Sequence, residues 1–214
     1  MTAFFYKKIP EYQLNEFIAV RDAFDNLSNV INFIEIINTC AHCKLNDYEE
    51  DFDLVMFSGE YRRALIKKSD GFFSMAIPFQ VLDIGDRISL NLDNFGVEVS
   101  GQFISIMRNA LETSRKSNFS HEDIVLSLCE NFSLELNEAI FYYDAFVSLV
   151  SEDHGYFRFD DDLANENGKF HPRYHFDFFC KNSSSIKIGV DKPIDINCFY
   201  ALFDSNYTKH YLRK

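Results

Sequence analysis

Residues 169–179 read Lys-Phe-His-Pro-Arg-Tyr-His-Phe-Asp-Phe-Phe, with apolar side chains at every even position from 170 to 178. Successive side chains of a β-strand point to opposite faces of the sheet, so this alternation predicts a strand with one apolar and one polar face. The polar face consists of His171, Arg173, His175 and Asp177. Packing requires the apolar face, but it does not require four ionisable residues in succession on the other. We therefore take the polar face as the candidate functional site.

A second strand is predicted at 186–190, where β-branched residues alternate with Lys187 and Gly189. Two neighbouring strands pair so that their apolar faces match. This pairing places Lys187 on the same face as the histidines of the first strand. The sequence therefore predicts a shared polar face with cations from both strands.

Two kinds of chemistry suit this face. A phosphate group would be bound by the cations of the polar face, Arg173 and Lys187, and by Lys169 at the start of the first strand. Neighbouring positions on one face lie about 6.6 to 7 Å apart, so Asp177 reaches His175 and orients its imidazole, as a general base requires. In an enzyme, His171 or His175 would cleave a phosphodiester without a metal. The alternative is a solvated sheet edge whose ion pairs have no function.

No metal and no other cofactor is expected. An extended strand places His171 and His175 about 13 Å apart, and Pro172 excludes the helix that would bring them to one face. Cys40 and Cys43 have the spacing of zinc ligands, but no second ligand pair follows at zinc-finger distance. The sequence therefore favours ordinary thiols at this helix end.

The predicted fold class is α+β, with antiparallel strands in two groups, a central helical section and a C-terminal helix. The strand segments are 52–57, 72–79 and 87–92 in the first group and 156–160, 170–179 and 186–190 in the second. Apolar spacing of three and four predicts helices at 13–27 and 30–43, or one helix there that is interrupted near Asn26. The same spacing predicts helices around 103–111, after Ser120, at 134–150 and at 195–205. Ser28 is the expected N-cap of the second helix, and 60–68 fits a helix slightly better than a strand. We expect a single domain, or two packed lobes comprising 1–150 and 151–214.

The charge is unevenly distributed along the 214 residues, whose formal net charge is −12. Residues 169–214 carry eight Lys and Arg against four Asp, a net of +4, so residues 1–168 carry −16. A polyanion is repelled by the molecule as a whole, which argues against nonspecific nucleic-acid binding. The C-terminal fifth is the part of the chain that an anionic ligand would favour.

The five cysteines are odd in number and widely scattered, which indicates reduced thiols. No apolar run approaches the roughly 18 residues that a membrane-spanning helix needs, so no membrane partner is expected. The first residues also lack the apolar run of a secretion signal. These features predict a cytoplasmic protein.

The C-terminal segment resembles the ending of small uncharacterised bacterial proteins carried in phage-defence or toxin–antitoxin loci. The resemblance consists of His171-Pro-Arg-Tyr-His175, a Lys-Ile-Gly strand, Pro193, and a helix with Phe199 and Phe203. It covers about the last fifth of the chain. It implies a cellular context rather than an activity, and it assigns no catalytic residue.

Two functions follow from these observations. The first is a cytosolic defence or stress accessory protein that binds RNA or a nucleotide on its C-terminal sheet face. The second is an acidic antitoxin or immunity-type protein whose residues 1–168 neutralise a basic partner protein. The sequence leaves open whether the chain is an enzyme, and it does not indicate an oligomeric state.

Overall fold

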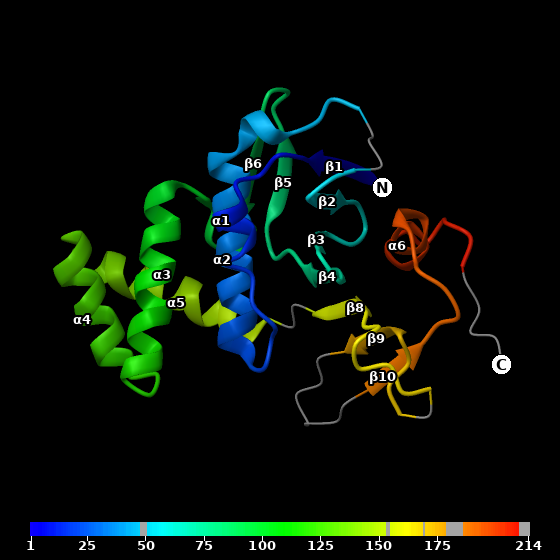
Figure 1. The fold of residues 1–214 in the computed structure, drawn as a ribbon. Coiled ribbons are helices and arrows are strands. Elements are labelled where there is room, and N and C mark those ends of the chain that lie inside the picture. The colour runs from blue at the N-terminus through cyan, green and yellow to red at the C-terminus, as the bar shows by residue number, and fades with distance from the viewer. Residues whose placement is uncertain (48–50, 153–154, 169, 179–185, 210–214) are drawn as a thin grey trace. The chain divides into compact units, whose positions relative to one another are not determined.

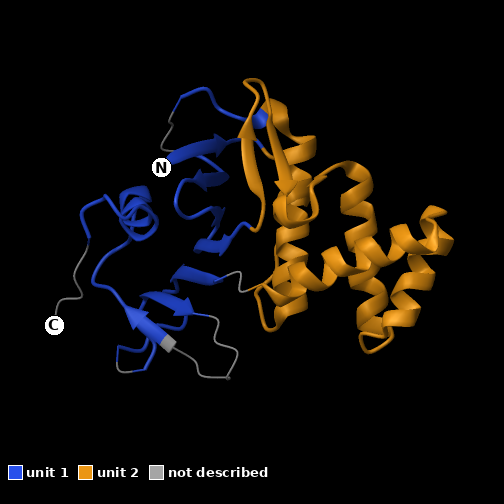
Figure 2. Cartoon of the chain, turned by 180° about the vertical axis from the view of Figure 1, so that it is seen from behind, with its two compact units in different colours: residues 1–8, 43–77, 154–214 blue, residues 9–42, 78–153 orange. Residues whose placement is uncertain are grey.

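The computed structural model of the chain describes residues 1–47, 51–152, 155–168, 170–178 and 186–209 (Figure 1). It contains 41% helix and 25% strand, and its sheets are antiparallel. The predicted α+β fold class is therefore confirmed. Two compact units make up the chain, and each consists of segments distant in sequence (Figure 2).

Unit 1 comprises residues 1–8, 43–77 and 154–214, and unit 2 comprises 9–42 and 78–153. This division differs from a boundary at residue 150, because the chain leaves unit 1 and returns to it twice. A 3-10 turn, η1 (Ala41–Cys43), lies at one of these crossings. The predicted second strand group therefore does not form a lobe of its own.

Unit 1 is built on a seven-stranded antiparallel sheet of order β1-β2-β3-β4-β8-β9-β10. Its strands are β1 (Thr2–Tyr6), β2 (Leu54–Ser58), β3 (Arg63–Lys68), β4 (Gly71–Ala76), β8 (Phe157–Asp161), β9 (Tyr174–Phe178) and β10 (Ile186–Gly189). The predicted strands at 52–57 and 72–79 join the second predicted group where β4 pairs with β8. The strand predicted at 87–92 in the same first group belongs instead to a separate sheet. The meander predicted for the C-terminal strands is present as β8-β9-β10.

Helix α6 (Ile196–Phe203) packs phenylalanine side chains onto one face of this sheet. Its N-terminus is capped by Asp195, whose carboxylate accepts hydrogen bonds from two backbone N–H groups. The ring centroids of Phe203 and Phe57 lie 5.1 Å apart, and those of Phe199 and Phe72 lie 5.2 Å apart. This aromatic core leaves the opposite face of β8, β9 and β10 to the polar residues.

The helix expected at 60–68 is wrong, because Arg63–Lys68 forms β3. Ala64 and Ile66 are fully buried and alternate with Arg63, Leu65 and Lys67 across the two faces of the sheet. Pairing with β2 and β4 on both sides supplies the backbone hydrogen bonds that a helix would otherwise supply. Tertiary pairing overrides the helical spacing here.

Unit 2 combines five helices with a three-stranded antiparallel sheet of order β5-β6-β7 among its described residues. The helices are α1 (Glu11–Leu14), α2 (Ala23–Thr39), α3 (Gly101–Lys116), α4 (His121–Phe132) and α5 (Leu136–Ser151). The strands are β5 (Gln80–Asp83), β6 (Ile88–Leu92) and β7 (Val97–Glu98), and the 3-10 turn η2 (Asp93–Phe95) precedes β7. Ser120 caps α4, as its position before an acidic first turn predicts.

One long helix, α2, replaces the two helices expected at 13–27 and 30–43. Its N-cap is Asp22 rather than Ser28, because the Asp22 carboxylate accepts a hydrogen bond from the N–H of Asp25 at 2.8 Å. Two buried amides then fix the preceding segment. Asn29 exchanges two hydrogen bonds with the backbone of Ile18, and Asn32 donates to the carbonyl of Glu16.

Candidate functional site

The polar face of the C-terminal meander brings five ionisable side chains together. In the observed register, Arg158 and Lys187 lie opposite Asp177 on either side of β9, and Asp160 lies opposite His175. The prediction that Lys187 joins the histidine face is therefore confirmed for His175. Arg158 and Asp160 were not predicted for this site, although the Phe-Arg-Phe-Asp alternation at 157–160 is the same signal that identified β9.

His175 is a buried structural residue rather than an exposed base. Its side chain is 0% exposed. Its Nδ1 lies 2.8 Å from the carbonyl oxygen of Pro172, which only accepts, so Nδ1 carries the proton. Its Nε2 lies 2.9 Å from Nζ of Lys187, which donates to it. Both ring nitrogens are occupied, and the backbone carbonyl, not Asp177, orients the imidazole.

An ion-pair network surrounds this histidine. The Nζ of Lys187 donates to both carboxylate oxygens of Asp177, at 2.8 and 2.9 Å. Arg158 lies 2.8 Å from Asp177 and 3.0 Å from Asp160 through the same guanidinium nitrogen. Two cations therefore balance two carboxylates around a neutral imidazole.

The two aspartates of the network respond to burial differently. Burial favours the neutral form of Asp177, but the hydrogen bonds from Lys187 and Arg158 outweigh it and lower the pKa of this carboxyl. Burial raises the pKa of Asp160, and the charge of Arg158 only partly opposes that rise. Asp177 is thus the carboxylate that the cations of the network stabilise in its charged form.

The loop before β9 places the other predicted residues differently from the prediction. Pairing of β9 begins at Tyr174, and the chain bends at Arg173 instead of continuing an extended strand from 170. The rings of His171 and His175 are therefore 4.8 Å apart between centroids, and the expected separation of about 13 Å is wrong. Phe170, expected on the apolar face, is 81% exposed.

Arg173 and His171 each lie beside an aspartate at the end of β8. Arg173 pairs with the last residue of the strand and His171 with the residue after it. The Nε of Arg173 donates to Asp161 at 2.7 Å, and its guanidinium lies over the ring of Tyr174. The Nε2 of His171 lies 3.3 Å from Asp162. Lys169, the third predicted phosphate ligand, lies outside the described residues. The predicted cations of the described face are therefore neutralised from within the chain.

Asp160, His175 and Asp177 also resemble a set of metal ligands. Each offers one ligand atom, and these atoms lie within 4.8 Å of one another. The ammonium of Lys187 lies among them, within hydrogen-bonding distance of His175 and Asp177. A metal ion at this position would have to displace Lys187, so the arrangement fits an internal ion-pair network better than a metal site.

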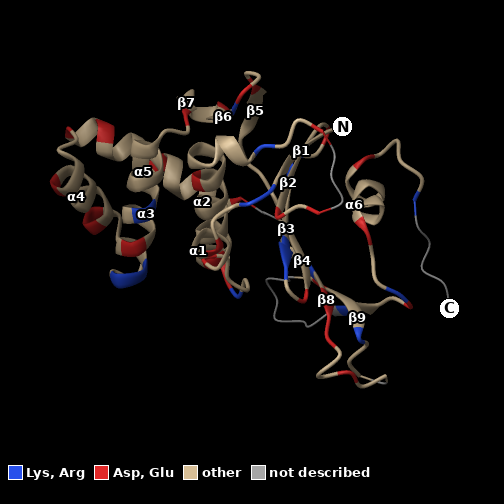
Figure 3. Ribbon diagram, turned by 45° about the horizontal axis from the view of Figure 1, so that its top comes forward, with Lys and Arg blue, Asp and Glu red and all other residues tan. Residues whose placement is uncertain are grey.

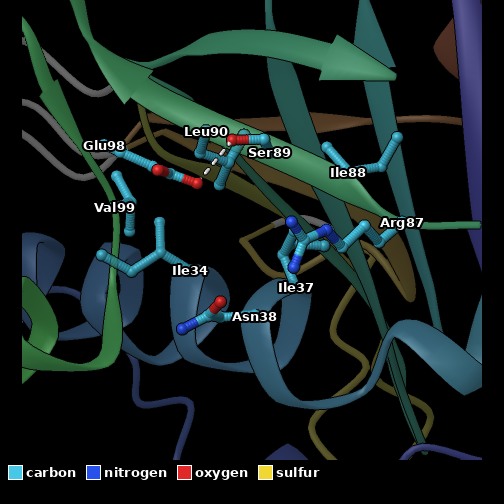
Figure 4. Close-up of a pocket in the computed structure, with 9 residues that line it drawn as sticks. All are labelled: Ile34, Ile37, Asn38, Arg87, Ile88, Ser89, Leu90, Glu98 and Val99. Carbon is cyan, nitrogen blue, oxygen red and sulfur yellow. Dashed lines mark hydrogen bonds between the residues drawn. The ribbon is translucent and has the colours of Figure 1, made fainter. Parts of the chain in front are cut away.

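A shallow hollow in unit 2 lies where α2 meets β6 and β7 (Figure 4). Its lining residues are Ile34, Ile37, Asn38, Arg87, Ile88, Ser89, Leu90, Glu98 and Val99. Asn38, Arg87 and Glu98 are exposed, and the hydroxyl of Ser89 already donates to Glu98 at 3.2 Å. The hollow therefore lacks buried, preorganised polar groups for recognising a ligand.

The excess negative charge of the chain belongs to unit 2. This unit carries five Lys and Arg against eighteen Asp and Glu, a net of −13, whereas unit 1 carries sixteen against fifteen, a net of +1. Residues 117–153, which include α4 and α5, contain eight Asp and Glu and no Lys or Arg (Figure 3). Comparing the net charges of residues 1–168 and 169–214 did not reveal this difference between the units, because each unit is made of segments that alternate along the chain.

Comparison with family models, with curated proteins and with solved structures finds no match to this chain. Among the described helices, none is both long and apolar enough to cross a bilayer.

Proposed function

We propose that this chain is a cytosolic protein-binding module whose acidic unit 2 binds a basic protein partner. The observation that carries the proposal is the segregation of charge, with −13 on unit 2 and +1 on unit 1. A surface of one sign attracts a partner of the other sign and steers its approach.

Two exposed carboxylates of α4 and α5 support this function, because their positions do not favour their helices. Glu130 lies in the last turn of α4, where the helix dipole disfavours a negative charge. Asp144 lies exposed in the middle of α5, where aspartate has a low helix propensity. Their presence agrees with a role in binding.

The polar sheet face supports phosphate binding less well. Arg173 is held by Asp161, and Lys187 is held by Asp177 and His175. A phosphate would have to compete with these carboxylates for each cation. An antitoxin or immunity-type protein that covers a basic surface of its partner agrees better with the charges, and it suits the bacterial context that the C-terminal resemblance implies.

The test uses a labelled helical peptide with arginines along one face and leucines along the other. Fluorescence anisotropy measures its affinity for the wild type and for Glu122→Gln/Glu130→Gln/Asp144→Asn, all on exposed positions of α4 and α5. We expect affinity to fall about tenfold in this variant and to fall with ionic strength.

A charge-matched control distinguishes the acidic helices from net charge alone. Glu11→Gln/Asp47→Asn/Asp86→Asn removes three exposed carboxylates elsewhere in the chain. We expect this control to weaken binding by less than about threefold, because these carboxylates lie outside α4 and α5 and salt screens the attraction of exposed charges that do not contact the peptide. An equal loss in both variants, or no binding by the wild type, would overturn the proposal.

A further inference from the structure

An exposed aromatic ring lies among the carboxylates of α5. Phe141 is 38% exposed, although it lies in a helix that has a buried face at Ala145, Phe146 and Leu149. Its ring contacts Phe95 of η2 edge-on, with centroids 5.7 Å apart and planes at 77°. It makes a second perpendicular contact with Tyr142, at 5.5 Å. Phe141 is thus held in place by its neighbours while part of its ring remains accessible.

Two carboxylates flank this ring. Residues three apart are neighbours on a helix surface, so Glu138 and Asp144 lie on either side of Phe141 along α5. Both are exposed, and neither pairs with a cation among the described residues. One carboxylate oxygen of Glu138 accepts the backbone N–H of Glu135 in the capping box of α5, at 3.1 Å, which leaves its other oxygen for a ligand. The combination of an accessible aromatic ring and two carboxylates complements a cation that also has an apolar or π surface.

We infer that Phe141, Glu138 and Asp144 form the anchor of the partner-binding surface and receive an arginine side chain of a basic protein. This inference rests on the proposed function and specifies its partner. A guanidinium stacks on an aromatic ring and donates to carboxylates in its own plane at the same time, whereas an ammonium is a strongly hydrated point charge. Arginine and aromatic residues are also the types that concentrate binding energy at protein interfaces.

The test uses the same arginine–leucine peptide and a second peptide in which every arginine is replaced by lysine. We expect the wild type to bind the arginine peptide more tightly than the lysine peptide. Phe141→Ala should weaken binding of the arginine peptide about three- to tenfold and reduce that preference. Phe141→Leu keeps an apolar contact with Phe95 but removes the π face, so it should lose the preference as well.

Ile84→Ala is the matched control, because Ile84 is an exposed apolar residue of unit 2 that lies between β5 and β6, outside α4 and α5. We expect it to leave both affinities unchanged. If Phe141→Ala and Phe141→Leu bind both peptides as the wild type does, while the triple carboxylate variant binds weakly, the arginine anchor is wrong and the acidic binding function stands. Absence of binding by the wild type would overturn both.

Discussion

At the scale of single residues, His175 is explained by its two partners. The Pro172 carbonyl fixes one ring nitrogen and Lys187 fixes the other, and the ring is excluded from solvent. The strand pattern predicted a polar face and implied that His175 was dispensable for folding. The structure shows that facing away from the aromatic core does not make a side chain exposed, because His171 and Pro172 of the preceding loop and Lys187 of β10 contact the ring of His175.

We therefore expect His175→Ala to destabilise the protein by about 2 to 4 kcal/mol, since it leaves a cavity and removes a partner from two partly buried polar groups, the Pro172 carbonyl and the Lys187 ammonium. Phe176→Ala should cost about 3 to 5 kcal/mol, as for other buried phenylalanines. His171→Ala, at a partly exposed site, should cost less than about 1 kcal/mol. Urea unfolding of the three variants measures these values, and equal small losses at both histidines would contradict the buried role of His175.

The two aspartates of the network should differ in how their stabilisation depends on pH. The folded pKa of Asp177 is lowered, so its contribution is present above the unfolded value of about 3.9 and is lost as the pH falls through the folded value. The folded pKa of Asp160 is raised, so its contribution is present below about 3.9 and is lost as the pH rises through the folded value.

An asparagine is permanently uncharged, so Asp177→Asn should be costlier than Asp160→Asn at pH 7. We expect about 3 kcal/mol for Asp177→Asn, which removes the shared partner of Lys187 and Arg158, and at least about 1 kcal/mol less for Asp160→Asn. The excess cost of Asp177→Asn should shrink as the pH is lowered towards 3. Identical losses at pH 7 in denaturant unfolding would show that the two carboxylates are equivalent.

At the scale of elements, the pairing of β4 with β8 decides how the two parts of unit 1 join. Gly71 begins β4 with a φ of +151°, and a Cβ at this position would lie 1.9 Å from the carbonyl oxygen of Phe159. The Phe159 backbone cannot move away from such a Cβ without breaking the hydrogen bonds between β4 and β8. The glycine is therefore required where these two strands, distant in sequence, approach each other.

Gly71→Ala should destabilise the protein by about 3 kcal/mol or more. Gly101→Ala is the matched control, because it lies at the start of α3 with nothing within 4 Å of the added Cβ. It should be neutral or slightly stabilising, since alanine is the better helix former. Thermal melts compare the two, and a Gly71→Ala variant as stable as the wild type would show that β4 and β8 do not pair in this register.

Local patterns were sufficient for the elements that depend on a single periodicity. They predicted the α+β class, the C-terminal meander, the cap of α4 and the helix α6. They could not predict the joining of β4 to β8 or the strand at Arg63–Lys68, because both depend on pairing between segments far apart in sequence. The predicted site was found only in part. Alternation correctly placed Lys187 beside His175, but the chain bends at Arg173, so that residue lies just outside the strand.

At the scale of the whole molecule, the segregation of charge between the units distinguishes two kinds of ligand. An anion would have to bind unit 1, whose predicted ligands Arg173 and Lys187 are already paired with aspartates. We therefore expect a titration with ATP and a short RNA to give no saturable binding at physiological salt. Saturable binding that is lost in Arg173→Ala would instead support the phosphate site on the sheet.

The acidic partner-binding surface is tested most directly by locating the residues at which a basic ligand binds. Backbone amide chemical shifts of isotope-labelled protein, followed by NMR during titration with the arginine–leucine peptide, report this position by residue. We expect shift changes concentrated on α4, α5 and η2, around Phe141 and Asp144, with the amides of β8 and β9 unchanged. Shift changes concentrated on β8 and β9, or spread evenly over the acidic residues of both units, would contradict it.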